Sequence, residues 1–144
     1  MTSADGPTAP GLVGVGSLRV EVGMPVDLGD SPLGRRRMVA ILGGSLAGEL
    51  GAGTVLAGGA DWQTLHDDGS VSVEAQYSIQ LDDGVITLRS SGIRAQSPDG
   101  AGVYFRASVL LTGPASRPDL NQTLFLSSGV RSGDTVHLDL YRVT

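Results

Sequence analysis

Two Asp-Asp-Gly turns, Asp67–Gly69 and Asp82–Gly84, enclose a run in which apolar and polar residues alternate. Asp-Gly pairs favour the tight turns of β-hairpins, because both residues tolerate the left-handed backbone of such turns. Alternation puts one set of side chains on a single apolar strand face, namely Val71, Val73, Ala75, Tyr77 and Ile79. The pattern therefore predicts an antiparallel strand with this face toward the protein interior.

Similar strand patterns recur along the chain, and no window shows the period of an amphipathic helix. Glycine contributes 22 of the 144 residues, scattered as many turns would require. We expect loops over 23–33, 95–102 and 113–118, and strand fragments with bends over 45–60. Further strands are expected at 18–22, 36–42, 85–89, 103–111, 123–126 and 135–143. Roughly seven to nine short strands predict an all-β, single-domain antiparallel barrel or sandwich, and closure into a barrel removes exposed edges.

Composition excludes several chemistries. The chain has no cysteine or lysine and only two histidines, so thiolate metal sites, thiol nucleophiles and Schiff bases cannot form. We therefore expect no cofactor and no metal. The net charge of −5 argues against nucleic acid as a partner. No apolar run suits a membrane, and residues 1–16 resemble a flexible tail rather than a signal peptide. These features predict a cytoplasmic barrel domain over residues 17–144.

A series of short motifs resembles one known family. The motifs are Gly34-Arg35-Arg36-Arg37, Gly43-Gly44, Gly58-Gly59-Ala60-Asp61-Trp62, Asp68-Gly69, Tyr77, Asp83-Gly84, Gly92-Ile93-Arg94, Tyr104-Phe105-Arg106, Asn121, Gly129 and Tyr141. In this order they resemble the bacterial and fungal β-barrel family called domain of unknown function 3237, over about residues 18–143. The resemblance implies a calycin-like antiparallel barrel with an interior of small-molecule size. The chain departs from the family pattern at Gln76, where an arginine is usual, and at Pro118-Asp119-Leu120, where an aromatic residue is usual.

The carboxylates of Asp61 and Glu74 are the candidate acid–base groups. Asp61 stands beside Trp62, the only tryptophan, and a carboxylate desolvated by an indole gains a higher pKa, which suits proton transfer. Alternatively, Asp61 caps a turn and Trp62 plugs one end of the barrel. Glu74 lies on the polar strand face, so it is catalytic if that face points inward and solvated if it points outward.

Tyr104 and Arg106 share a strand face two residues apart. Together a phenol and a guanidinium can hold a carboxylate, enolate or phenolate, and otherwise they form a surface stack. Both are candidate catalytic residues. The candidate substrate-binding residues are Trp62, Gln76, Tyr77, Arg36 and Asn121.

Three functions remain open from the sequence. The first is a cofactor-independent lyase, isomerase or cyclase that acts on a hydrophobic, oxygenated small molecule such as a polyketide-like intermediate. The second is a non-catalytic barrel that binds a small hydrophobic ligand. The third is a structural protein that forms a homodimer through an outer sheet face. An ionisable group inside a hollow barrel would favour the first.

Overall fold

The computed structural model describes residues 6–144 and has ten antiparallel strands in one sheet. In most strands the apolar residues are buried and the polar residues between them are exposed, as the alternation in the sequence predicts. The strands are β1 (Leu12–Val22), β2 (Val26–Ser31), β3 (Gly34–Ala47), β4 (Gly53–Val55), β5 (Ala60–Leu65), β6 (Val71–Leu81), β7 (Gly84–Gln96), β8 (Val103–Thr112), β9 (Phe125–Ser132) and β10 (Thr135–Val143). A 3-10 helix, η1 (Pro118–Gln122), joins β8 to β9.

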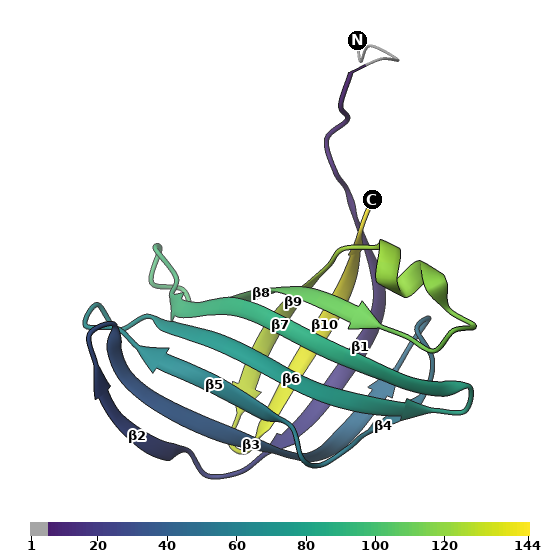
Figure 1. Cartoon of the computed structure of the whole chain (residues 1–144). Coiled ribbons are helices and arrows are strands. Elements are labelled where there is room, and N and C mark those ends of the chain that lie inside the picture. Colours follow the sequence, from purple (N-terminus) through teal and green to yellow (C-terminus); the bar gives the residue numbers. More distant parts are fainter. Residues whose placement is uncertain (1–5) are drawn as a thin grey trace.

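The sheet closes into a barrel because β1 pairs with β10 on one side and with β3 on the other. From β6 to β10, strands adjacent in sequence are also adjacent in the sheet. The gap between β3 and β6 is filled by two short strands, β4 at one end and β5 at the other. The β2–β3 hairpin extends the barrel wall beyond the end of β1 (Figure 1). The fold is therefore an all-β, single-domain, antiparallel calycin-like barrel, as the sequence predicts.

Apolar side chains fill the half of the barrel next to η1. Leu120 of η1 is 2% exposed and joins this core, and Arg117 holds the helix in place by donating from Nη1 to the Leu50 carbonyl oxygen at 2.7 Å. The core in this half also includes Ile79, Leu81, Ile86, Leu88, Val109, Leu111, Phe125 and Leu140. The turns after β2, β5 and β7 lie at the opposite end (Figure 1). One end of the barrel is thus packed, and any interior site must lie toward the other.

The buried face of β6 is the one that the sequence predicts. Val73, Tyr77 and Ile79 are buried, whereas Glu74 and Gln76 are exposed. A shift of β6 by one residue would turn each of its side chains to the opposite face of the sheet. The agreement therefore means that the sequence also places the two turns that flank β6 correctly.

Two elements differ from the sequence-based expectations. Residues 12–16 belong to β1 rather than to a tail, since Leu12 pairs with Val143 and a register shift between Gly14 and Gly16 keeps the strand in the sheet. The expected loop over 23–33 contains β2, in which Val26 and Leu28 are the only apolar side chains and both are exposed. Within residues 6–144 no helix has the length and apolar character needed to cross a membrane.

Candidate functional site

A narrow cavity occupies the half of the barrel away from η1. The space between its lining atoms is about 600 Å³ with the open mouth counted, but only about 50 Å³ admits the centre of a water-sized molecule. Most of the wall is apolar, formed by Val20, Val22, Val39, Ile41, Val73, Ala75, Tyr77, Phe105, Ala107, Val136 and Leu138. Its polar side chains are Asp61, Gln63, Ser90, Arg94, Ser127 and Arg131. The composition of this wall, apolar with a few converging polar groups, is that of a small-molecule site, whereas the open volume is far below the roughly 300–1,000 Å³ usual for one.

The glycine pair before β5 positions Asp61. Gly58 has a φ of 110°, a left-handed conformation that glycine adopts without strain. A Cβ atom on Gly59 would lie 2.4 Å from a backbone oxygen of β6, so only glycine allows the chain to pass so close to that strand. Strand alternation then turns Asp61 and Gln63 into the cavity. The sequence motif thus brings a carboxylate into an apolar interior.

A chain of side-chain hydrogen bonds holds Asp61. Gln63 donates from Nε2 to Asp61 Oδ2 at 2.6 Å, and its Oε1 accepts from Nε of Arg37 at 2.5 Å. Burial raises the pKa of Asp61 to about 6, although the Gln63 hydrogen bond and then Arg94, Arg37 and Arg131 act in the opposite direction. Both protonation states of Asp61 are therefore populated near neutral pH, as proton transfer requires.

Two buried oxygen atoms in this region have no hydrogen-bond partner within residues 6–144, namely Asp61 Oδ1 and the Tyr77 hydroxyl. Both residues line the cavity. Burial raises the pKa of the Tyr77 phenol, and the charge of Asp61 raises it further, so Tyr77 stays protonated and can donate. Because buried polar atoms are normally paired, these two indicate room for a polar ligand atom.

Arginines from three strands converge near Asp61. Arg37 comes from β3, Arg94 from β7 and Arg131 from β9. Arg94 and Arg131 line the cavity, and Arg37 is bonded to Gln63, another lining residue. The Arg94 guanidinium also lies over the Phe105 ring, 6.0 Å from its centroid. The cavity thus combines one carboxyl group with several fixed cations.

Five of the predicted site residues lie on the outer face of the barrel, in an open pocket that we call the outer groove. The centre of a water-sized molecule has about 940 Å³ of space there, against about 50 Å³ in the interior cavity. The lining includes Arg36, Trp62, Glu74, Tyr104 and Arg106. Trp62 is 54% exposed and faces Glu74 on the neighbouring strand. Arg106 stacks on the Tyr104 ring at 5.3 Å, which matches the surface-stack alternative. The structure therefore separates these five residues from Asp61.

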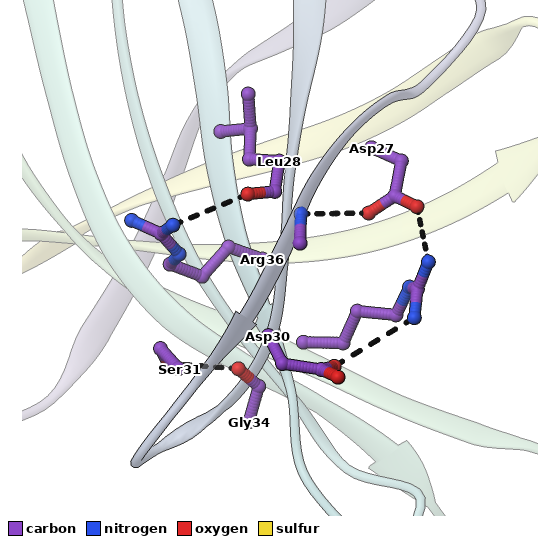
Figure 2. A network of polar contacts seen from close by, with 8 residues as sticks. Asp27, Leu28, Asp30, Ser31, Gly34 and Arg36 are labelled. Carbon is purple, nitrogen blue, oxygen red and sulfur yellow. Dashed lines mark hydrogen bonds and ion pairs between the residues drawn. The ribbon is translucent and has the colours of Figure 1, made fainter.

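Arg36 is part of a surface network on the β2–β3 hairpin (Figure 2). Its Nη2 donates to the Leu28 carbonyl oxygen at 3.1 Å. The neighbouring Arg35 forms ion pairs with Asp27 and Asp30. These contacts give both arginines a role in holding the hairpin.

The remaining predicted binding residues divide between interior and surface. Tyr77 lines the cavity beside Ala75 of the same strand. Gln76 is exposed on the opposite face of β6. Asn121 lies in η1, where its Oδ1 accepts a hydrogen bond of 3.0 Å from the Gly113 amide, so it stabilises the loop at the packed end of the barrel.

The sequence pattern that defines the protein of unknown function family DUF3237 matches residues 10–143. The chain belongs to the DUF3237 family. Among curated relatives, a UPF0311 protein from Rhodopseudomonas palustris is 32% identical over 141 residues, with 88% of this chain and 92% of the relative covered. A UPF0311 protein from Clostridium acetobutylicum is 39% identical over 80 residues, which cover 54% of this chain and 51% of the relative.

Solved structures of similar proteins share the DUF3237 barrel. A β-barrel-like protein from Acinetobacter baumannii has a TM-score of 0.90 at 28% identity, with 97% of this chain and 99% of the other covered. A protein of unknown function from R. palustris has a TM-score of 0.88 at 28% identity, with 96% and 100% covered. An enzyme from Penicillium herquei has a TM-score of 0.74 at 22% identity over 99% and 100% of the two chains, a likeness of fold alone.

Sequence reasoning missed most of the polar groups inside this DUF3237 barrel. Gln63 is two residues after Asp61 on the same strand, so alternation alone places both on one face. Arg94 and Arg131 gave no comparable signal, because each sits near a strand end where either face can be solvated. Arg37 is opposite to Arg36 by alternation, but the sequence does not say which of the two points inward.

Proposed function

We propose that this DUF3237 protein is a cofactor-independent lyase, isomerase or cyclase whose cavity binds a hydrophobic, oxygenated small molecule. One observation carries the proposal: a buried carboxyl group in the cavity has one oxygen without a partner and a pKa of about 6. Perturbed carboxyl groups in clefts are frequent at catalytic sites, because burial tunes them for proton transfer.

Asp61 is the proposed base. Its free Oδ1 would remove a proton from carbon next to a carbonyl group, and the C–H electron pair would form the double bond of an enolate. The negative charge would then rest on the carbonyl oxygen, where a guanidinium such as Arg94 can stabilise it. Asp61 would return the proton to another atom of the substrate, which completes an isomerisation or assists a ring closure.

Gln63 and Tyr77 have supporting roles in this proposal. Gln63 holds Oδ2 of Asp61 and leaves Oδ1 available for a substrate. Tyr77 offers a neutral hydroxyl group that can donate to a substrate oxygen. The apolar wall excludes water, which strengthens each of these interactions. The Penicillium herquei enzyme supports the proposal only in that a barrel of this fold occurs in an enzyme.

A proton-exchange assay tests the proposal without knowledge of the natural substrate. 2-Tetralone is a flat, apolar ketone with acidic protons, and its exchange with deuterium oxide can be followed by proton NMR. We expect the protein to accelerate exchange and Asp61→Asn to reduce that acceleration by about 100-fold or more. Glu74→Gln, which changes the outer groove instead, should leave the rate unchanged. Full acceleration by Asp61→Asn would contradict the role of Asp61.

The alternative is a non-catalytic barrel that binds a small ligand. The largely apolar wall favours it as much as it favours an enzyme. Under this alternative 2-tetralone binds without accelerated exchange, and Asp61→Asn changes its affinity only modestly. Binding measured by calorimetry beside the exchange assay separates the two functions.

A further inference from the structure

The charge of the cavity is opposite to the charge of the whole protein. The chain carries a net charge of −5. Around the cavity, however, Arg37, Arg94 and Arg131 bring three positive charges, and Asp61 is the one acidic side chain that lines it. The pKa of Asp61 near 6 means that even this negative charge is partly absent at slightly acid pH. The interior is therefore a positive site within an acidic protein.

None of these three cations forms an ion pair with a described acidic side chain, although Asp61 is close enough for its charge to act on the pKa of Arg94. Within residues 6–144, the ion pairs involve Arg35 and Arg142 and none of the three arginines near the cavity. Arg94 donates no hydrogen bond to the protein groups described, and Arg131 uses its Nε for the Gly133 carbonyl oxygen at 2.9 Å, which leaves its two Nη groups free. Free guanidinium groups at a cavity are suited to bidentate binding of a carboxylate or similar anion.

The arginines also repel one another. Burial lowers the pKa of Arg94, and the charges of Arg37 and Arg131 lower it further. A half-buried cation is costly unless an anion compensates it. The stacking of Arg94 on Phe105 limits where its guanidinium group can move, and Phe105 itself lines the cavity. An anionic ligand would relieve this repulsion, whereas a neutral ligand would not.

We propose, on the basis of the small-molecule function proposed above, that the ligand of the cavity carries a negatively charged oxygen group on a flat apolar body. Carboxylates and phenolates have this chemistry. Arg94 and Arg131 bind the charged oxygen atoms, the apolar wall contacts the flat body, and Asp61 Oδ1 faces a hydroxyl or acidic C–H group of the same molecule. A thin body is part of the proposal because the centre of a water-sized molecule has only about 50 Å³ of space in the cavity, which leaves little room for a bulky ligand.

A matched pair of compounds tests the charge requirement. 2-Naphthoate and 2-naphthamide have nearly the same shape and differ in charge, and calorimetry measures the affinity of the full chain for each. We expect the carboxylate to bind at least about tenfold more tightly, because hydrogen bonds from a guanidinium group are stronger to a charged acceptor than to a neutral one. Arg94→Met and Arg131→Met should each reduce this preference, and the double variant should abolish it.

Two arginines of the outer groove provide matched controls. Arg36→Met and Arg106→Met remove the same charge from β3 and β8, and both should keep the preference. Circular dichroism and thermal melting establish that each variant is folded, and Arg94→Gln serves if Arg94→Met is not. Equal affinity for the two compounds, or no binding of either at millimolar concentration, overturns the proposal. So does a preference that is lost in Arg106→Met and kept in the double variant.

The proposal and the enzymatic function can fail separately. A tenfold preference for 2-naphthoate without any proton exchange on 2-tetralone would support an anion-binding barrel and contradict the enzyme. Proton exchange that depends on Asp61, together with equal affinity for the two naphthyl compounds, would support the enzyme and contradict the anionic ligand.

Discussion

Gln63 donates a hydrogen bond of 2.6 Å to Asp61, and the two side chains come from alternate positions of the same strand. Gln63 is 5% exposed, and its other amide atom accepts from Arg37. A buried amide group can use both its NH₂ group and its carbonyl oxygen only if an acceptor lies on one side of it and a donor on the other. The pair therefore fixes the orientation of Asp61 and also opposes the effect of burial on its pKa.

Asp61→Asn should stabilise the fold above pH 6. The pKa of Asp61 rises from 3.8 to about 6 on folding, so ionisation is easier in the unfolded chain. The wild type is therefore destabilised progressively between about pH 4 and pH 6, and the variant is not. At pH 7 the variant should be more stable by about 2 to 3 kcal/mol, and at pH 3.5 by almost nothing. Urea unfolding across this pH range measures the difference.

Asp68→Asn is a control that should change the stability of the fold at neutral pH in the opposite direction. Hydrogen bonds from Ser70 lower the pKa of Asp68, which is fully exposed in the turn after β5. Its carboxylate is favoured in the folded state, so the substitution should weaken the fold at neutral pH, and this loss should fade as the pH falls through the lowered pKa. A gain at neutral pH for both variants would indicate a general charge effect and contradict the account of Asp61.

Gln63→Leu should raise the pKa of Asp61 further. The hydrogen bond from Gln63 stabilises the carboxylate, and its removal leaves burial less opposed. Carbon-13 NMR of the Asp61 carboxyl group reads the titration directly, so the result does not depend on turnover. The outer-face variant Gln76→Leu should leave the titration where it is in the wild type. A midpoint that falls in Gln63→Leu would contradict the proposed role of this bond.

Trp62 should report the solvent rather than the cavity. The sequence places Trp62 beside Asp61 and suggests a shared site, but the indole is 54% exposed on the outer face of β5. We expect its fluorescence to resemble that of tryptophan in water and to be quenched readily by acrylamide. Saturation with a flat carboxylate that does not absorb at the red edge of tryptophan excitation, such as benzoate, should leave the emission almost unchanged. A large blue shift would show that a ligand binds at the outer groove.

The contrast between Asp61 and Trp62 shows what can be predicted from the sequence alone. Adjacent residues in a strand point to opposite faces, so the period of two already separates them once β5 is recognised. The sequence also identifies the buried face of β6, because its apolar side chains outnumber those on the other face. Both predictions depend on local pattern, which the barrel preserves.

The polar interior could not be predicted in the same way. Alternation puts Arg94 on the strand face of the buried Ile86 and Leu88, and Arg131 on that of Phe125, but only because β7 and β9 continue that far. The length of both strands depends on their pairing with β8 and β10. The hairpin strand β2 was missed for a related reason. Its residues are mostly exposed and polar, and its place in the sheet comes from the long partner β3.

Two truncations test where the barrel begins. Residues 7–10 are exposed, and the first backbone bonds to the sheet join Gly11 to Thr144. Removal of residues 1–10 should therefore leave the melting temperature nearly unchanged. Removal of residues 1–15 should lower stability by about 2 kcal/mol or more, because it deletes the buried Val15 and the pairing of Leu12 with Val143. Equal melting temperatures for both truncations would contradict the start of β1 at Leu12.

Gly129→Ala should narrow the cavity, because the added methyl group displaces two of the side chains that line it. A Cβ atom on Gly129 would lie 2.8 Å from the Phe105 ring and 2.8 Å from a methyl group of Leu138, and both of these side chains line the cavity. They can make room only by moving toward the open space, so we expect a loss of about 1–3 kcal/mol in stability and weaker binding of 2-naphthoate.

Phe105→Leu in the same chain should restore part of the stability lost in Gly129→Ala, because the smaller side chain leaves space for the new methyl group. Gly43→Ala is the matched control, since the nearest neighbours of a Cβ atom there are 3.8 Å and 3.9 Å away. Urea unfolding and calorimetry measure both effects. If Gly129→Ala binds 2-naphthoate as the wild type does while losing stability, the ligand does not reach Phe105, and the binding site lies outside this part of the barrel.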